Sequence, residues 1–265
     1  MYWADAITLE PVYEIPTKDG KGMTNRIPPS RARDQDLLPR VTGIIHDMLG
    51  EGAGLRKYKE RKLIDAASGN LQASDERDAE YEKRILSLAY EDAKDARERG
   101  KVVHAAIDTF LRGGADDGEP AAAEAIIELT QFLEGAKPAS IEPEHTLGSA
   151  SLGFAGTPDI VLTGVDLAAV LLQCDRSPYI AGEGTVIIDL KTTNLSTYKR
   201  PYREWRYQFG GYHHLLKLGE GTTFFVQWLV DPWTGESKWI LYDDVDRWRK
   251  AFDGIWNAWR SEHEW

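Results

Sequence analysis

Two short apolar runs, each interrupted by an aspartate, constrain the fold of this 265-residue chain more than any other feature. Gly153–Leu162 contains Asp159, and Thr185–Thr192 contains Asp189. Both runs have the length, the composition and the flanking turn residues of β-strands. Because a carboxylate is costly to bury unless it is paired or binds a metal, the two aspartates indicate a sheet that carries a polar site.

Lys191 follows Asp189 by two residues, so the two side chains point to the same side of a strand. Leu190 then faces the opposite side together with Val186 and Ile188, where it can pack against a core. A structural ion pair explains most Asp-x-Lys tripeptides, and this signal is weak by itself. It becomes much stronger beside the Gly-Thr-Pro-Asp sequence that ends at Asp159.

The rest of the chain predicts helices first and strands later. Helical periodicity covers 40–49, 55–67, 73–111, 120–135, 202–218 and the C-terminal segment. Gly100 is expected to kink or divide the long helix, and Thr42 to cap the first one. Further strands are expected at 141–147, 222–230 and 237–242, the last two as a hairpin. The predicted fold class is α/β or α+β, with a short mixed sheet flanked by helices.

The expected organisation is an N-terminal arm at 1–37 and a single domain at 38–265. Residues 164–184, between the two aspartate-bearing strands, are interpreted as an insertion. The last helix carries an apolar stripe, and its residues are expected to pack in the core rather than stack on bases: Trp248, Phe252, Ile255, Trp256 and Trp259.

The net charge of −11 argues against a nucleic-acid binder, because phosphate contacts need Lys and Arg. However, basic residues cluster in Leu55–Leu63 and Tyr198–Arg206, and a solvated helix face is the plain alternative for each cluster. No run approaches the roughly 18 apolar residues of a membrane span. The start of the chain lacks the features of a secretory signal, and Cys174 is the only cysteine. A cytoplasmic protein without membrane attachment is expected.

Pro158-Asp159 followed by Asp189-Leu190-Lys191 resembles the PD-(D/E)xK nuclease superfamily. Three further features are similar to its RecB-type and phage recombination exonuclease branch. His104 lies on a helix ahead of the sheet, and Glu144 lies upstream of Asp159. Gln208 and Tyr212 form a Q-x-x-x-Y pattern after the lysine. The resemblance implies the restriction-endonuclease-like core of that superfamily.

The resemblance also implies roles for these residues. Asp159 and Asp189, with His104 and Glu144, would be ligands of Mg²⁺, for which Mn²⁺ could substitute. The two aspartates, together with Lys191, Gln208 and Tyr212, would carry out catalysis.

Plain alternatives remain for three of these assignments. His104 shares a helix face with Ile107, as a core histidine would. Glu142 has the same strand parity as Glu144, and Gln208 with Tyr212 could be a buried pair. Gly210 and Gly211 suggest that their helix closely approaches DNA or the sheet.

DNA contacts are expected at two places. Leu38–Thr42 is similar to an element of phage exonucleases beside the DNA end, where Arg40 would contact phosphate and Thr42 would supply a hydroxyl. Arg200, Arg203 and Arg206 follow the lysine and are expected to contact phosphates. A single cysteine excludes the four-cysteine iron–sulfur cluster of some relatives.

The predicted function is therefore a phage-type, metal-dependent DNA exonuclease acting in recombination or DNA processing. Its partners would be DNA and a single-strand annealing protein, and a homo-oligomer is compatible with the sequence. Two alternatives stay open. One is a structure-specific or restriction-like endonuclease, and the other is a catalytically silent, nuclease-like DNA-binding module.

Overall fold

A computed structural model describes residues 3–19, 21–50, 53–114, 119–216 and 222–265. Its centre is a five-stranded sheet in the order β12–β11–β10–β9–β6. These strands are β6 (Ser140–Pro143), β9 (Ile160–Asp166), β10 (Glu183–Thr192), β11 (Thr223–Val230) and β12 (Ser237–Tyr242). β10 runs parallel to β11, and the other neighbours are antiparallel. The expected mixed sheet and its hairpin are confirmed.

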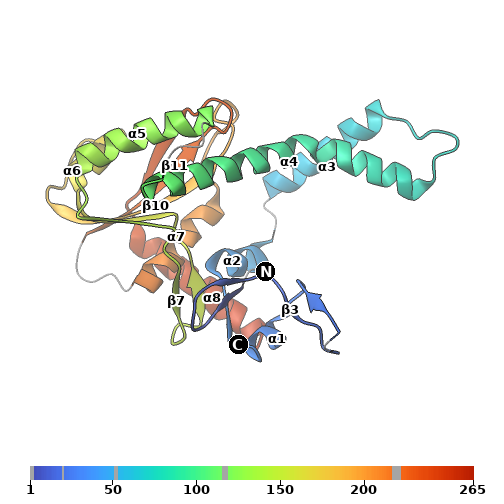
Figure 1. The fold of residues 1–265 in the computed structure, drawn as a ribbon, viewed down its shortest axis with the longest axis horizontal. Coiled ribbons are helices and arrows are strands. Elements are labelled where there is room, and N and C mark those ends of the chain that lie inside the picture. Colours follow the sequence, from blue (N-terminus) through green and yellow to red (C-terminus); the bar gives the residue numbers. More distant parts are fainter. Residues whose placement is uncertain (1–2, 20, 51–52, 115–118, 217–221) are drawn as a thin grey trace.

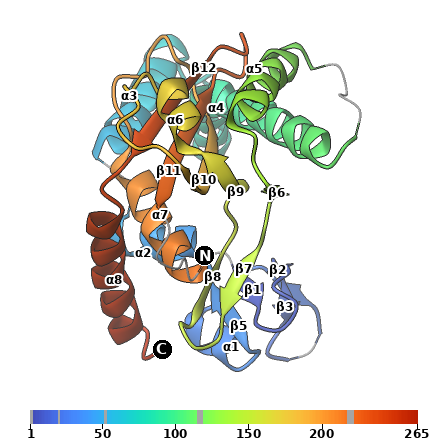
Figure 2. The same ribbon diagram turned by 90° about the vertical axis from the view of Figure 1, so that its left-hand side faces the viewer.

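Helices cover both faces of this sheet (Figures 1 and 2). Val186, Ile188 and Leu190 of β10 are buried with α4 (Asp78–Leu111), α5 (Pro120–Ala136) and α6 (Leu167–Gln173). Ile187 faces the other core, which contains α2 (Val41–Leu49), α7 (Arg203–Leu216) and α8 (Val245–Glu262). The predicted alternation along β10 is therefore confirmed. The helix expected at 202–218 is α7, and its expected end at residue 218 lies outside the described residues.

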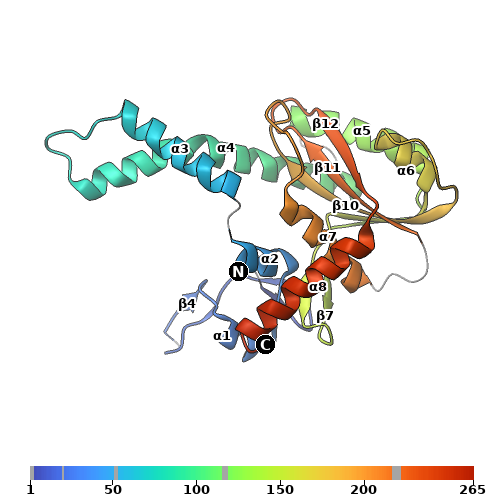
Figure 3. The ribbon, with the colours of Figure 1, turned by 180° about the vertical axis from the view of Figure 1, so that it is seen from behind.

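α3 (Ala53–Gly69) and the outer part of α4 form a helical hairpin that projects from the body of the molecule (Figures 1 and 3). The expectation that Gly100 divides the long helix is wrong, because α4 continues through it. A Cβ added at Gly100 would lie 2.3 Å from Thr192 Oγ1. The glycine is therefore needed for the close approach of α4 to the end of β10.

Two expected strands are each divided. Gly153–Leu162 contains β8 (Phe154–Gly156), which pairs with β7 (Leu147–Ser149), and then β9, which enters the central sheet. The expected strand at 141–147 likewise splits into β6 and the start of β7. Glu144 lies in the turn between them with a positive φ of 42°. Asp159 therefore lies immediately before β9 rather than within a continuous strand.

Residues 3–19 and 21–37 pack against the rest of the domain through short elements. β1 (Trp3–Asp5) pairs with β2 (Pro11–Val12) and with β5 (Leu37–Pro39). β3 (Ile15–Pro16), β4 (Met23–Thr24) and α1 (Pro29–Arg33) follow β2. Trp3 is only 1% exposed, and its ring lies 6.5 Å from that of Trp259 on α8. The leading segment thus contributes to the same core as the C-terminal helix.

Residues 164–184 hold the end of β9, helix α6 and the connection to β10. Asp166 caps α6 by accepting a hydrogen bond of 2.9 Å from the Ala168 N–H. Leu167 and Leu171 are buried in the core beside α5. This segment therefore extends the α4–α5 side of the sheet.

The glycine pair of α7 packs against other helices. A Cβ on Gly210 would lie 2.3 Å from the Trp248 carbonyl oxygen of α8, and one on Gly211 would lie 2.7 Å from the Val41 methyl groups of α2. The expected approach to DNA or to the sheet is thus wrong, since the close contacts are with α8 and α2. The tryptophan stripe of α8 is core, as expected, with Trp248, Trp256 and Trp259 buried.

Candidate active site

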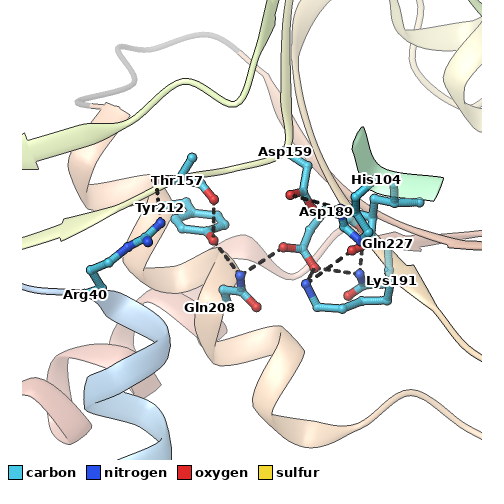
Figure 4. Close-up of polar contacts among 10 residues, drawn as sticks. Arg40, His104, Thr157, Asp159, Asp189, Lys191, Gln208, Tyr212 and Gln227 are labelled. Carbon is cyan, nitrogen blue, oxygen red and sulfur yellow. Dashed lines mark hydrogen bonds and ion pairs between the residues drawn. The ribbon is translucent and has the colours of Figure 1, made fainter. Parts of the chain in front are cut away.

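Asp189 is the most constrained side chain of the site, at 2% exposure on β10. Its Oδ1 accepts a hydrogen bond of 2.9 Å from Gln208 Nε2. Its Oδ2 accepts one of 2.7 Å from Gln227 Nε2 and lies 2.5 Å from Lys191 Nζ (Figure 4). Donors from three side chains therefore hold one carboxylate in a single orientation.

Asp159 approaches the same centre from the segment before β9. Its Oδ2 accepts a hydrogen bond of 2.6 Å from the Leu190 N–H, which ties it to β10. Its Oδ1 lies 3.8 Å from His104 Nδ1 on α4. Burial, and then the negative charge of Asp189, raise the pKa of Asp159 to about 7. This carboxyl group therefore holds its proton weakly at neutral pH, and a bound cation would displace that proton.

Lys191 and His104 occur in opposite charge states at neutral pH. Burial works against the charge of Lys191, but Asp189 and Asp159 outweigh it and raise the lysine pKa above its ordinary value. Burial and then the Lys191 charge lower the pKa of His104 to about 4, although its side chain is 31% exposed. The imidazole is consequently neutral and able to act as a ligand.

Gln208 and Tyr212 are buried on α7, one helical turn apart, and belong to the same network as the aspartates. Gln208 Nε2 donates to the Tyr212 hydroxyl at 2.5 Å, and that hydroxyl donates to the Thr157 carbonyl at 2.9 Å. Burial, then the charges of Asp189 and Asp159, raise the Tyr212 pKa well above its ordinary value. Gln208 and Tyr212 thus form the buried pair that was the alternative to a catalytic role, and this pair connects the loop before Asp159 to Asp189.

Arg40 and Thr42 lie beside this network at the start of α2. Arg40 Nη2 donates to Thr157 Oγ1 at 2.7 Å, and Arg40 itself, not Thr42, is the N-cap residue of α2. The expected capping role of Thr42 is therefore wrong, and its side chain instead lines the central pocket. That pocket of about 220 Å³ is formed by residues from several elements: Tyr13, Arg40, Thr42, Gly156, Thr157, Asp159, Asp189, Lys191, Gln208 and Tyr212.

His104 and Glu144 line a neighbouring pocket of about 550 Å³ between α4 and the end of β10. Glu142 pairs with His145, whose Nδ1 lies 3.0 Å from its Oε2. The Glu144 backbone N–H donates to the Asp159 carbonyl oxygen at 2.7 Å. Of the two glutamates with equal strand parity, Glu144 is thus the one that lines the same pocket as His104, whereas Glu142 pairs with His145.

The side chains of Asp159, Asp189 and His104 offer the types of donor atom that a divalent cation binds. Carboxylate oxygens and a neutral imidazole are ligands that Mg²⁺ or Mn²⁺ accepts. Asp159 Oδ1 receives no hydrogen bond from the described residues, and the raised pKa of this carboxyl group reflects burial first and then the negative charge of Asp189. Within the described part of the chain, no three His, Cys, Asp or Glu side chains converge closely enough to hold an ion. In this structure the ammonium group of Lys191 balances the negative charge of Asp189.

The three arginines after β10 differ in their surroundings. Arg206 packs on α7 with its guanidinium 5.5 Å from the Tyr242 ring centroid and 5.1 Å from that of Trp248. Arg200 and Arg203 are exposed, and Arg203 lies 6.0 Å from the Tyr207 ring. None of the three lines the central pocket.

Gln227 and Tyr13 belong to the site but were not predicted from the sequence. Gln227 is fully buried and faces Asp189 across the parallel pair of β10 and β11. The signal was a glutamine inside the apolar run 223–230, where a polar side chain must find a partner. No pattern marks Tyr13, which reaches the pocket from the leading segment.

No protein-family model and no curated protein matches the sequence. Among solved structures, the chain is similar to the crystal structure of LHK-Exo in complex with dAMP, with 12% identity and a TM-score of 0.41, over 91% of this chain and 93% of that one. It is also similar to the crystal structure of SSO0001, with 12% identity and a TM-score of 0.30, over 77% and 87% respectively. Similarity at this level assigns no activity. None of the described helices is both long and apolar enough to cross a membrane.

Proposed function

We propose that this chain is a metal-dependent deoxyribonuclease, and that the pocket around Asp159, Asp189 and Lys191 hydrolyses phosphodiester bonds. The observation that carries the proposal is the meeting of the buried Asp189, the partly buried Asp159 and Lys191 at one end of a β-strand, beside a cationic Arg40. A purely structural ion pair needs one carboxylate and one lysine. A second carboxylate with a pKa near 7 adds only destabilisation unless a cation joins it.

Asp159, Asp189 and His104 would hold the cation once their side chains move closer together than they lie in this structure, with Glu144 at the edge of the same region. Mg²⁺ is the expected ion and Mn²⁺ a substitute. When bound, it would polarise a phosphate oxygen and acidify a water molecule.

The residues of the chain contribute orientation and charge. Lys191 carries a full positive charge at neutral pH and is 28% exposed, so its ammonium group can stabilise negative charge that develops on the phosphate. Gln208 and Gln227 hold Asp189 from two sides, which preserves its orientation when substrate arrives. Tyr212 and Arg40 hold Thr157 and thereby the backbone before Asp159.

The finer proposal is a phage-type exonuclease that acts in recombination or DNA processing, with a single-strand annealing protein as partner. It rests on the resemblance of His104, Glu144 and the Gln208–Tyr212 pattern to that branch. The restriction-like endonuclease and the catalytically silent module are the alternatives.

One digestion experiment separates these three functions. End-labelled linear DNA and covalently closed circular DNA are incubated with the protein in Mg²⁺, in Mn²⁺ and in EDTA, with Lys191→Ala as the matched control. An exonuclease degrades the linear DNA and spares the circle, whereas cutting of the circle indicates an endonuclease. DNA binding without cleavage in either metal would refute the proposed activity and indicate the silent module.

A further inference from the structure

The segment Tyr198–Arg206 follows β10 and runs into the first turn of α7. It combines exposed cations with aromatic rings, and we call it the aromatic–basic segment. Lys199, Arg200 and Arg203 are exposed, and none of them forms an ion pair with a described residue. The cations of the aromatic–basic segment therefore remain available to an anionic partner.

Three aromatic rings are interleaved with these cations. Tyr202 is 56% exposed, and its ring meets that of Trp205 edge to face at a centroid distance of 4.8 Å. The ring of Tyr198 lies nearly parallel to that of Trp205, at 6.4 Å and 10°. Trp205 thus holds Tyr202 in place from one side while much of the Tyr202 ring stays open to solvent. An exposed, supported ring of this kind is suited to stacking.

The aromatic–basic segment adjoins the candidate active site. Trp205 precedes Gln208 by three residues on α7, so the two side chains lie on the same side of the helix, about 5 Å apart along its axis. Gln208 in turn donates to Asp189. A strand bound at the site therefore reaches the aromatic–basic segment within a few nucleotides.

Resting on the nuclease function proposed above, we propose that the aromatic–basic segment binds single-stranded DNA next to the catalytic centre. Tyr202, supported by Trp205, stacks on an unpaired base, while Lys199, Arg200 and Arg203 contact phosphates. The base faces of a duplex are covered by their neighbours, so a side chain that stacks on a base needs a single strand. The preferred substrate is accordingly DNA with a single-stranded portion.

The test measures binding in EDTA, where a metal-dependent nuclease does not cut, using a fluorescently labelled oligothymidylate and a blunt duplex of equal length. Tyr202→Ala is expected to weaken oligothymidylate binding about 5- to 100-fold, the loss that follows from one base–aromatic stack. Tyr202→Phe keeps the ring and should bind as the unmodified protein does. Tyr179→Ala removes a tyrosine of similar exposure, 58%, from a different loop and serves as the matched control.

The salt dependence tests the cations separately. Arg200→Ala and Arg203→Ala should each lower the slope of log affinity against log salt by about 0.7 for the single strand. Unchanged oligothymidylate affinity in Tyr202→Ala overturns the inference, as do equal losses for duplex and oligothymidylate. Cleavage of linear DNA by the unmodified protein is recorded in parallel with Mg²⁺. If cleavage is present but Tyr202 has no effect, this inference fails and the nuclease stands. If Tyr202-dependent binding occurs without cleavage, the nuclease fails instead.

Discussion

Replacement of Asp159 by asparagine should stabilise the metal-free protein, although it removes a group proposed to be essential for activity. Asparagine keeps an oxygen that can accept the hydrogen bond from the Leu190 N–H, now 2.6 Å long. It removes the negative charge that burial and Asp189 make unfavourable. The expected gain in the free energy of unfolding therefore comes from the charge alone.

The pKa of Asp159 sets the size of this gain. A pKa raised from 3.8 to about 7 corresponds to roughly 4 kcal/mol of disfavoured ionisation. Since the folded-state pKa is the higher one, stability is fully present below pH 3.8 and is lost as the pH rises through 7. The penalty accumulates between pH 3.8 and 7, so the gain from Asp159→Asn should be about 1–1.5 kcal/mol at pH 5 and reach about 2–4 kcal/mol at pH 8. For a chain of this size, the gain corresponds to a rise in Tm of roughly 4–10 °C.

Thermal unfolding in EDTA at pH 5 and pH 8 measures this difference for each variant against the unmodified protein. Asp231→Asn is the matched control, because Asp231 is buried away from the site and accepts hydrogen bonds from the Leu195 and Trp233 N–H groups. It should lose about 1–3 kcal/mol, because asparagine leaves one of these donors unpaired. A Tm of Asp159→Asn at or below that of the unmodified protein at pH 8 would refute the assigned electrostatics.

Three further predictions concern catalysis, the metal and the fold. Lys191→Ala should lower the single-turnover cleavage rate about 100- to 1,000-fold while DNA affinity changes little, and equal losses of both would contradict a role in the transition state. His104→Ala should raise the Mn²⁺ concentration needed for cleavage and be partly rescued by excess Mn²⁺. Because its pKa is lowered to about 4, His104→Ala should also leave the shape of the pH profile between pH 6 and 8 unchanged, and an unaltered Mn²⁺ requirement would return His104 to a packing role. Gly100→Ala should destabilise the fold by about 1–3 kcal/mol, because its Cβ would lie 2.3 Å from Thr192 Oγ1. Thr192→Ala should restore most of that loss in chemical denaturation, whereas additive losses would exclude the contact.

The sequence predicted the polar face of β10 correctly because a strand alternates its side chains regardless of what surrounds it. Asp189 and Lys191 on one side and Leu190 on the other follow from that alternation alone. The buried link between Gln208 and Tyr212 followed in the same way from helical spacing.

Features that depend on tertiary contacts were not predictable in this way. A continuous apolar run looks the same whether or not the chain changes its partner strand. The sequence therefore predicted one strand where the structure has β8 and β9, separated at Thr157. The low helix propensity of Gly100 suggested an interruption, but the contact with Thr192 outweighs it. Gln227 could be recognised as an unusual residue, yet only the parallel pairing of β10 and β11 identifies Asp189 as its partner.

The projecting hairpin of α3 and α4 has a consequence for how the molecule opens. The inner part of α4 is anchored by buried Val103, Ala106 and Ile107, whereas Ile85 and Ala89 are the residues of its outer part that are buried. Few apolar contacts there mean a low free energy of local opening, so one continuous helix contains two cooperative units of different stability. Amide protons of the outer unit should exchange first. A protease that cuts between α3 and α4 should accordingly leave the remainder folded, with its active pocket still assembled.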